Sequence, residues 1–240
     1  TFDLGTGGIH GCIKSGVYQS TENETIVDAD VASLYPSLGI TLNLYPEHLG
    51  EQFSKIYEEG IVKPRLEAKK NGDKVMADGF KLSANSVYGK SNSEYSFLYD
   101  PLYTLKTTLA GQLALCMLSE MLMTRVPNLK MLQINTDGLT VIIPNEYKRL
   151  YWEICQEWET QTNLMFIRDV NNYIAVTQKD GKVKYKGTFK PNKEMRKDGE
   201  YHKAFNQGIV ATTVNNYFLY DTPILETLHE CKDIYEFCKT

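Results

Sequence analysis

The chain has 240 residues, enough to bury a substantial core in one large domain or in one domain with a subdomain. With 42% hydrophobic and 23% charged residues, the composition excludes an intrinsically disordered chain. The net charge of −4 argues mildly against nucleic-acid binding, so such binding would depend on local clusters of basic residues.

No membrane span or disulfide framework is indicated. The most apolar stretch, residues 109–123, is interrupted by polar side chains and falls short of the ~20 residues that cross a bilayer. The five cysteines are widely spaced and include no Cys-x-x-Cys pair, which argues against a zinc knuckle. We therefore expect a cytoplasmic protein without membrane attachment.

Residues 26–38 carry the first functional signal. A short apolar run predicts a strand that ends in Asp28 and Asp30, whose carboxylates a strand would place on one face. Pro36 can then open a helix at residues 35–43. A carboxylate beside free backbone N–H groups can hold a metal ion next to a phosphate. An acidic surface turn is the alternative, and the pattern alone favours neither.

Helical spacing of apolar residues and helix-breaking residues predict the other helices. They are expected at residues 51–59, 64–70, 79–88, 101–125, 146–160 and 204–219, with short helices in 224–239. Gly89 is expected to stop the third of these helices. A stripe in the long helix 101–125 is interpreted as core packing: Leu105, Leu109, Leu113, Met117 and Met121.

Strands and turns are predicted from short apolar runs bounded by turn residues. A short strand is expected at 95–99, and strands at 131–134 and 139–143 form a β-hairpin. A second hairpin is expected at 173–189 around an Asp-Gly turn. The glycine-rich residues 7–11 predict a tight structural turn and match no Walker loop or dinucleotide fingerprint.

Two predicted helices could bind phosphate groups. Lys81, Asn85 and Tyr88 fall on one helical face, which suits a triphosphate at one end and a base or sugar at the other. Arg65 and Lys69 are one turn apart in a basic stretch, although that stretch alone is more typical of a solvated helix.

The tip of the first hairpin would place a carboxylate rigidly. If Asp137 faces Asp30, the pair could bridge two divalent cations that activate a primer 3′-hydroxyl and neutralise a pyrophosphate leaving group. Magnesium suits this chemistry because it prefers oxygen ligands and keeps substrate phosphates in its coordination shell. Paired carboxylates also serve metal-dependent nucleases, but a nuclease needs no triphosphate-binding face.

Three stretches, in this order, resemble the polymerase motifs of family B DNA polymerases of the phage or plasmid type. Residues 30–37 (Asp-x-x-Ser-Leu-Tyr-Pro-Ser) look like motif A, and residues 81–89 (Lys-x-x-x-Asn-Ser-x-Tyr-Gly) look like motif B. Residues 136–138 (Thr-Asp-Gly) resemble motif C, usually Asp-Thr-Asp-Ser. The resemblance implies an α+β fold, in which a palm with a small antiparallel sheet is flanked by helices and joined to a short helical fingers subdomain.

The resemblance also implies a division of the chain. The palm would begin at residues 1–50, short fingers ending in the motif B helix would occupy 51–90, the palm would resume at 91–203, and a thumb or C-terminal helices would start at 204–240. An exonuclease domain and a full thumb are not expected here. They would be missing regions of the same polypeptide, or a processivity partner would be needed.

Roles for single residues follow from the resemblance, position by position. Asp30 and Asp137 would be catalytic metal ligands, with the Val31 carbonyl as a third ligand. Tyr35 would exclude a 2′-hydroxyl as a steric gate. The nucleotide-binding residues would be Ser33, Leu34, Tyr35, Arg65, Lys69, Lys81, Asn85 and Tyr88. Primer and template would contact Gly7, Gly8, Thr136, Lys182, Lys184 and Lys186.

The sequence departs from the family pattern in three places. Asn135 stands where the first aspartate of motif C is usual, which removes one negative charge and could lower metal affinity. Gly138 replaces the usual serine. Residues 184–187 resemble the basic motif that holds the primer end, but Val183 occupies the usual lysine position, so a neighbouring lysine would take its place.

These features predict a template-directed DNA polymerase that adds deoxynucleotides to a primer 3′ end and replicates phage or plasmid DNA. Its cofactors would be two Mg²⁺ ions, with Mn²⁺ as a substitute, and its partners primer–template DNA and deoxynucleoside triphosphates. A phage or plasmid enzyme would work in the bacterial host cytoplasm. Two alternatives remain: a non-catalytic nucleic-acid-binding module that keeps the palm, and a metal-dependent nuclease.

Overall fold

The computed structural model describes residues 3–14, 16–171, 173–179, 182–189 and 208–237, with only the backbone for some of them, including residues 166–189. The chain divides into two compact units, Thr1–Ile13 with Val27–Val170 and Lys14–Ile26 with Asn171–Thr240. Every helix within the described ranges is too short or too polar to cross a membrane.

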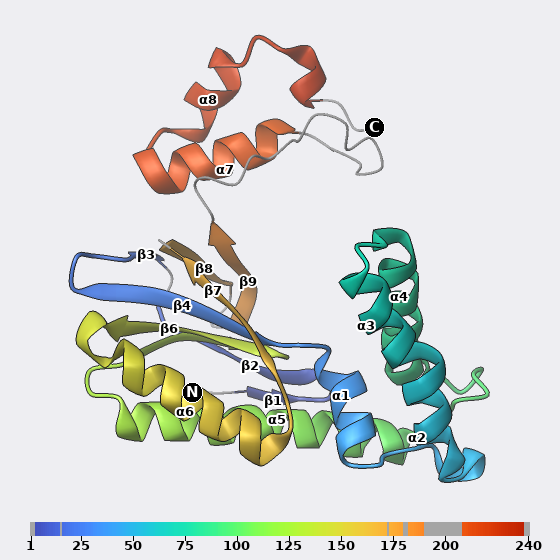
Figure 1. Ribbon diagram of the computed structural model, residues 1–240. Helices are drawn as coiled ribbons and strands as arrows, with labels where there is room; N and C mark the ends of the chain where they lie inside the picture. The colour runs from blue at the N-terminus through green and yellow to red at the C-terminus, as the bar shows by residue number, and fades with distance from the viewer. Residues whose placement is uncertain (1–2, 15, 172, 180–181, 190–207, 238–240) are drawn as a thin grey trace. The chain divides into compact units, whose positions relative to one another are not determined.

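A six-stranded sheet forms the base of the first unit, in the order β1–β2–β5–β6–β4–β7 (Figure 1). Its strands are β1 (Asp3–Gly5), β2 (Gly8–Cys12), β4 (Glu24–Val31), β5 (Lys130–Asn135), β6 (Gly138–Pro144) and β7 (Phe166–Asn171). The first four strands in the sheet order pair antiparallel, with His10 opposite Asn135 and Asn135 opposite Gly138. The β5–β6 hairpin confirms the predicted one, and the mixed α+β class is confirmed as well.

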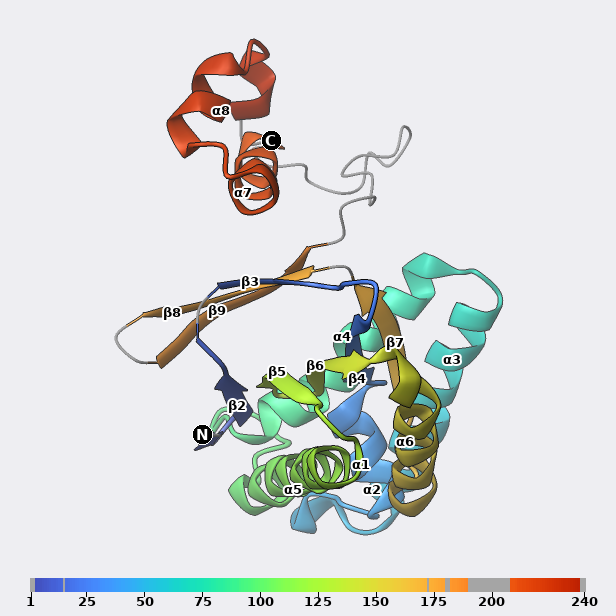
Figure 2. The same ribbon diagram turned by 90° about the vertical axis from the view of Figure 1, so that its left-hand side faces the viewer.

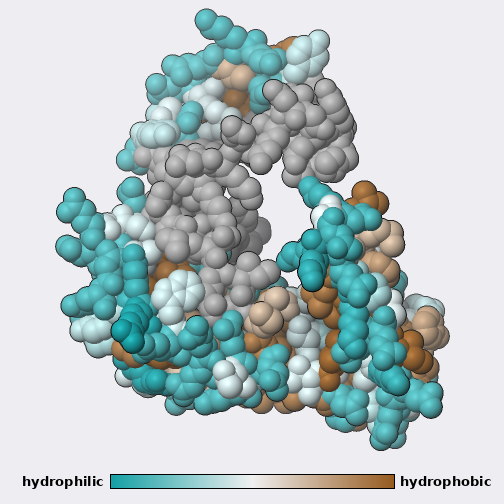
Figure 3. Space-filling view, in the orientation of Figure 1, coloured by the Kyte–Doolittle hydropathy of each residue, from teal (hydrophilic) through white to brown (hydrophobic). Residues whose placement is uncertain are grey.

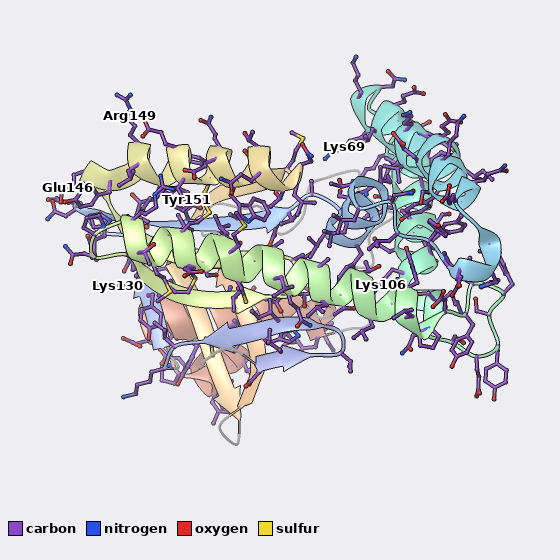
Figure 4. The ribbon with its side chains drawn as sticks, turned by 90° about the horizontal axis from the view of Figure 1, so that it is seen from below. Lys69, Lys106, Lys130, Glu146, Arg149 and Tyr151 are labelled. Atoms are coloured by element: carbon purple, nitrogen blue, oxygen red, sulfur yellow. The ribbon has the colours of Figure 1, made fainter. Side chains whose placement is uncertain are left out.

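Two long helices, α5 (Pro101–Arg125) and α6 (Lys148–Thr162), lie side by side on one face of this sheet (Figures 1 and 2). Helix α5 has the predicted bounds, because Pro101 opens it and the Asp100 side chain accepts hydrogen bonds from two first-turn N–H groups. The Trp158 indole donates a 2.8 Å hydrogen bond to the Ala114 carbonyl and joins the two helices. Tyr151 of α6 is fully buried in the same core (Figure 4).

The buried face of α5 is only partly the predicted one: Met117 and Met121 of the predicted stripe pack against the core. The leucines of the predicted stripe are exposed: Leu105 by 59%, Leu109 by 46% and Leu113 by 59%. The buried face carries Leu115, Leu118 and Leu122 together with small and hydroxyl-bearing residues. Helix α1 (Leu34–Thr41) approaches this face so closely that a Cβ on Gly111 would lie 3.1 Å from a Leu34 methyl carbon. Small residues therefore mark the packed face. Lys106 extends from the outer side of the helix (Figure 4).

A helical arm is formed by α2 (Gln52–Tyr57), α3 (Lys63–Lys70) and α4 (Lys74–Ser91), and its face in Figure 3 is mostly hydrophilic. A π-helical segment, Glu58–Val62, joins α2 to α3 without a break, whereas two separate helices were expected. Pro64 has no N–H to donate within the helix, and the Lys63 N–H instead bonds the Glu58 carbonyl five residues back. The wider π-helical turn thus accommodates Pro64 without ending the helix.

Two local predictions are wrong at the end of α4. Gly89 does not stop the helix, which continues to Ser91, a buried residue whose hydroxyl lies 2.8 Å from that of Thr104. The expected strand at 95–99 is a series of turns, because the Ser96 and Tyr99 N–H groups bond carbonyls three residues earlier. These contacts bury Leu98 against the arm instead of pairing an extended strand.

The described residues of the second unit form a three-stranded sheet and three helical segments. Strand β8 (Tyr173–Lys179) pairs antiparallel with both β3 (Gly16–Gln19) and β9 (Lys182–Phe189), which confirms the predicted second hairpin. Helices α7 (Gly208–Tyr220) and α8 (Ile224–Glu230) and the 3₁₀ turn Ile234–Phe237 follow. The short C-terminal helices are as expected, while the predicted start of α7 at 204 lies outside the described residues.

Candidate functional site

A cavity of about 480 Å³ lies in the first unit, bounded by the end of β4, helix α1, the helical arm and the β5–β6 turn. Every residue predicted to bind a nucleotide lines it, as do Val31 and Asp137. The sequence analysis missed three further lining residues, Ala32, Pro36 and Leu66, which carry no charge or functional group that would have marked them.

One wall of the cavity is basic. Arg65 and Lys69 of α3 and Lys81 of α4 line it, and Lys69 extends from the arm in Figure 4. The Arg65 guanidinium donates a hydrogen bond to the Ser33 hydroxyl across the cavity. Within the described ranges, no carboxylate forms an ion pair with any of these three cations. A polyphosphate would therefore meet three cations that are not held in ion pairs.

The α4 wall confirms the expected geometry of its motif. Lys81, Asn85 and Tyr88 face the cavity together because they recur at helical spacing, while Ala84 and Val87 on the other face are buried. Asp73 caps the start of this helix, because its carboxylate accepts a 3.0 Å hydrogen bond from the Met76 N–H.

The opposite wall carries the β5–β6 turn. The Val31 N–H donates to the Asp137 carbonyl and the Thr136 N–H to the Ile9 carbonyl, each over 2.7 Å. Thr136 adopts a left-handed conformation with a φ of 42°. A Cβ on Gly8, whose φ is +147°, would lie 3.0 Å from the Thr136 Cγ2. The glycine turn and the hairpin tip therefore pack together, and a side chain at position 8 would separate them.

The Asp137 carboxyl has a raised pKa. Partial desolvation by the surrounding protein is the main cause, and the negative charge of Asp28 raises the pKa further, whereas a backbone hydrogen bond and Lys81 lower it. Asp28 itself accepts a 2.5 Å hydrogen bond from the Thr140 hydroxyl. A positive ion beside Asp137 would thus relieve an unfavourable charge.

Asp30 does not line the cavity but lies against the same hairpin. A Cβ on Gly138 would overlap the Asp30 Oδ1 and lie 2.7 Å from the Ala29 carbonyl oxygen. No group of three or more His, Cys, Asp or Glu side chains suited to a metal occurs in the described part of the chain. Oxygen atoms that could help to hold a metal here are those of Asp30, Asp137 and the Val31 carbonyl, and oxygen ligands suit Mg²⁺ when substrate phosphates complete the shell.

Tyr35 is fixed between two partners. Its ring stacks on that of Tyr88, with centroids 4.0 Å apart and planes inclined by 19°, and its hydroxyl donates a 2.7 Å hydrogen bond to the Gly7 carbonyl. Burial holds the Tyr35 pKa far above its usual value, with further contributions from Tyr88 and Asp137. The Tyr88 hydroxyl lies 2.7 Å from the hydroxyl of Thr108, which sequence motifs did not single out.

Asn135 is engaged by a residue from the neighbouring strand. The His10 Nδ1 and the Asn135 Oδ1 are 3.1 Å apart, and the two residues face each other in the β2–β5 register. Only the ring nitrogen can donate in this pair, because the amide oxygen is an acceptor. The side chains of Lys182, Lys184 and Lys186, predicted to contact the primer, lie outside the described residues.

Comparisons with known proteins identify the fold. No protein-family model and no curated protein sequence matches the chain. Among solved structures, the chain is similar to the family B DNA polymerase from the hyperthermophilic archaeon Pyrobaculum calidifontis, with a TM-score of 0.57 and 14% identity. The match covers 93% of this chain and 31% of that polymerase. The chain therefore has a polymerase-like fold and spans about a third of the length of the similar protein.

Proposed function

We propose that this chain is the palm-and-fingers part of a family B DNA polymerase, which adds deoxynucleotides to a primer 3′ end under the direction of a template. The observation that carries the proposal is the shared cavity, which Asp137 and Val31 line together with the cations of α3 and α4. Acidic and basic walls around one space are what a metal-bound nucleoside triphosphate requires.

The basic wall would hold the triphosphate. Arg65, Lys69 and Lys81 would contact its oxygens, and the free N–H groups at the start of α1, next to Ser33, would add neutral donors. Asn85 would bind farther along the nucleotide. Tyr35 would lie under the sugar and exclude a 2′-hydroxyl, since its ring is fixed by Tyr88 and Gly7.

The acidic side of the site would hold two Mg²⁺ ions, for which Mn²⁺ could substitute. Asp30, Asp137 and the Val31 carbonyl offer oxygen ligands, and the raised Asp137 pKa indicates a site where added positive charge is favourable. When bound, the ions would activate the primer hydroxyl and neutralise the leaving pyrophosphate. Gly8 and Thr136 pack together beside this wall, where primer and template would pass over them and over Gly7.

Isosteric replacement of the two carboxylates tests the proposal. Asp30→Asn and Asp137→Asn should each abolish Mg²⁺-dependent primer extension while the circular dichroism spectrum stays unchanged. Glu153→Gln, on the exposed side of α6, is the matched control and should extend primers normally. Extension that persists in either aspartate variant would contradict the proposal.

A non-catalytic DNA-binding module is the second candidate, because Asn135 removes a usual carboxylate and its amide oxygen is bonded by His10. Such a module would shift primer–template DNA on a gel but extend no primer at any Mg²⁺ or Mn²⁺ concentration. A nuclease is disfavoured by the basic nucleotide wall. Phage or plasmid origin, cytoplasmic location and completion by an exonuclease, a thumb or a processivity partner remain predictions.

A further inference from the structure

Gly138 begins strand β6 and meets the end of β4 with no space for a side chain. An added Cβ would overlap the Asp30 Oδ1, lie 2.7 Å from the Ala29 carbonyl oxygen and lie 3.1 Å from the Asp30 Cα. Real Cβ atoms essentially never approach other heavy atoms within 3.0 Å. Two of these neighbours are backbone atoms, so a rotamer change at Asp30 alone could not accommodate even a methyl group.

The end of β4 and the β5–β6 turn cannot separate freely either. The Val31 N–H donates to the Asp137 carbonyl over 2.7 Å, and these residues directly follow Asp30 and directly precede Gly138. A side chain at position 138 would have to break this hydrogen bond or displace Asp30.

We propose that Gly138 is a positioning residue, whose missing side chain keeps the Asp30 carboxylate beside the Asp137 hairpin. Its link to metal binding and catalysis rests on the proposed polymerase function, but the steric relationship does not. The position of Asp30 matters more here than in a site with three carboxylates, because Asn135 is neutral and its oxygen is bonded by His10.

A double-mutant cycle in urea tests the steric relationship without metal or DNA. Gly138→Ala should lower the unfolding midpoint strongly in the parent chain and less in an Asp30→Ala background, where the overlapping carboxylate is absent. Gly79→Ala is the matched control: beyond its chain neighbours and the nearby backbone of its own helix, no atom lies within 4 Å of the added Cβ, so its midpoint should not fall. An equal loss in both backgrounds, or failure to fold in both, would assign the conflict to Ala29 and overturn the proposal. Folding only in the Asp30→Ala background would support it.

Calorimetric titration with Mn²⁺ tests the consequence for the site. Folded Gly138→Ala should bind Mn²⁺ about 10-fold or more weakly than the parent, as expected when a ligand is displaced. Unchanged Mn²⁺ affinity would overturn the proposal. If the parent chain neither binds Mn²⁺ nor extends primers, the polymerase assignment fails, and the urea cycle alone then decides whether Gly138 positions Asp30.

Discussion

The hydroxyl of Tyr35 donates a 2.7 Å hydrogen bond to the carbonyl oxygen of Gly7, although the two residues are 28 positions apart. Stacking on Tyr88 fixes the same ring by a second contact, with centroids 4.0 Å apart. One side chain thus connects helix α1, the α4 wall and the glycine turn. The position of the ring is therefore set by two contacts that can be removed one at a time.

Removal of the hydroxyl alone should weaken sugar discrimination. Tyr35→Phe keeps the ring but loses a hydrogen bond worth about 1 kcal/mol, so the preference for deoxynucleotides, measured as the ratio of kcat/KM values, should fall about fivefold. Tyr35→Ala should largely abolish the preference. Tyr18→Phe, which loses a 2.7 Å bond to the Lys14 carbonyl in the second unit, should have no effect. Unchanged discrimination in both Tyr35 variants would refute the gate role.

The raised pKa of Asp137 predicts that this carboxyl destabilises the folded chain at neutral pH. A group with a folded pKa above its unfolded value, about 3.9 for aspartate, binds protons more tightly when folded. Its contribution to the unfolding free energy therefore falls as the pH rises through the folded pKa. Without divalent cations, Asp137→Asn should be more stable than the parent at about pH 7, and the gain should vanish near about pH 3. Urea unfolding across this range measures the difference, and lower stability of the variant at neutral pH would contradict it.

Asp100 should show the opposite pH dependence. Burial would raise its pKa, but three backbone N–H donors, those of Tyr103, Glu47 and Leu102, together with His48 hold it below the usual value. Its stabilisation is complete above the unfolded pKa of about 3.9 and is lost as the pH falls through the folded pKa.

Asp100→Ala should therefore cost about 1–2 kcal/mol at neutral pH, with the loss shrinking in acid. Asp73→Ala removes a cap that holds only the Met76 N–H, and it should cost less at neutral pH. Urea unfolding of both variants at neutral and acidic pH measures the two losses, and equal losses at both pH values for Asp100→Ala would argue against the charge effect.

The corrected orientation of α5 predicts a contrast between two leucines of the same helix. Leu109→Ser changes a residue that is 46% exposed and should alter the unfolding free energy by about 0.5 kcal/mol or less. Leu118→Ala empties part of the core and should cost about 2–5 kcal/mol. Chemical denaturation of both variants measures the contrast. A large loss for Leu109→Ser would show that the outer face of α5 is packed after all.

Features that depend on local rules were predicted well from the sequence. Pro101 marked the start of α5, and the 3.6-residue period placed Lys81, Asn85 and Tyr88 on one face of α4. The stretches that resemble motifs A and C then meet at one cavity, because strands β4 and β6 are neighbours in the sheet.

Features that depend on tertiary contact could not be predicted in this way. A period of four residues finds a leucine stripe on α5, but the close approach of α1 at Gly111 decides which stripe is buried. Likewise, the sequence shows Gly138 only as a departure from a motif. The contacts that leave no room for a side chain there come from the neighbouring strand β4. No local sequence pattern predicts the hydrogen bond from the Tyr35 hydroxyl to the Gly7 carbonyl.

Both tryptophans of the chain, Trp152 and Trp158, lie on α6 in the first unit, and Trp158 is fully buried with its indole bonded to the Ala114 carbonyl. Tryptophan fluorescence therefore reports the unfolding of the unit that contains the cavity and gives no signal from the other unit. Circular dichroism registers the helices of both. Denaturation followed by the two signals on one sample would separate the stability of the candidate catalytic unit from that of its companion, without labels or truncation.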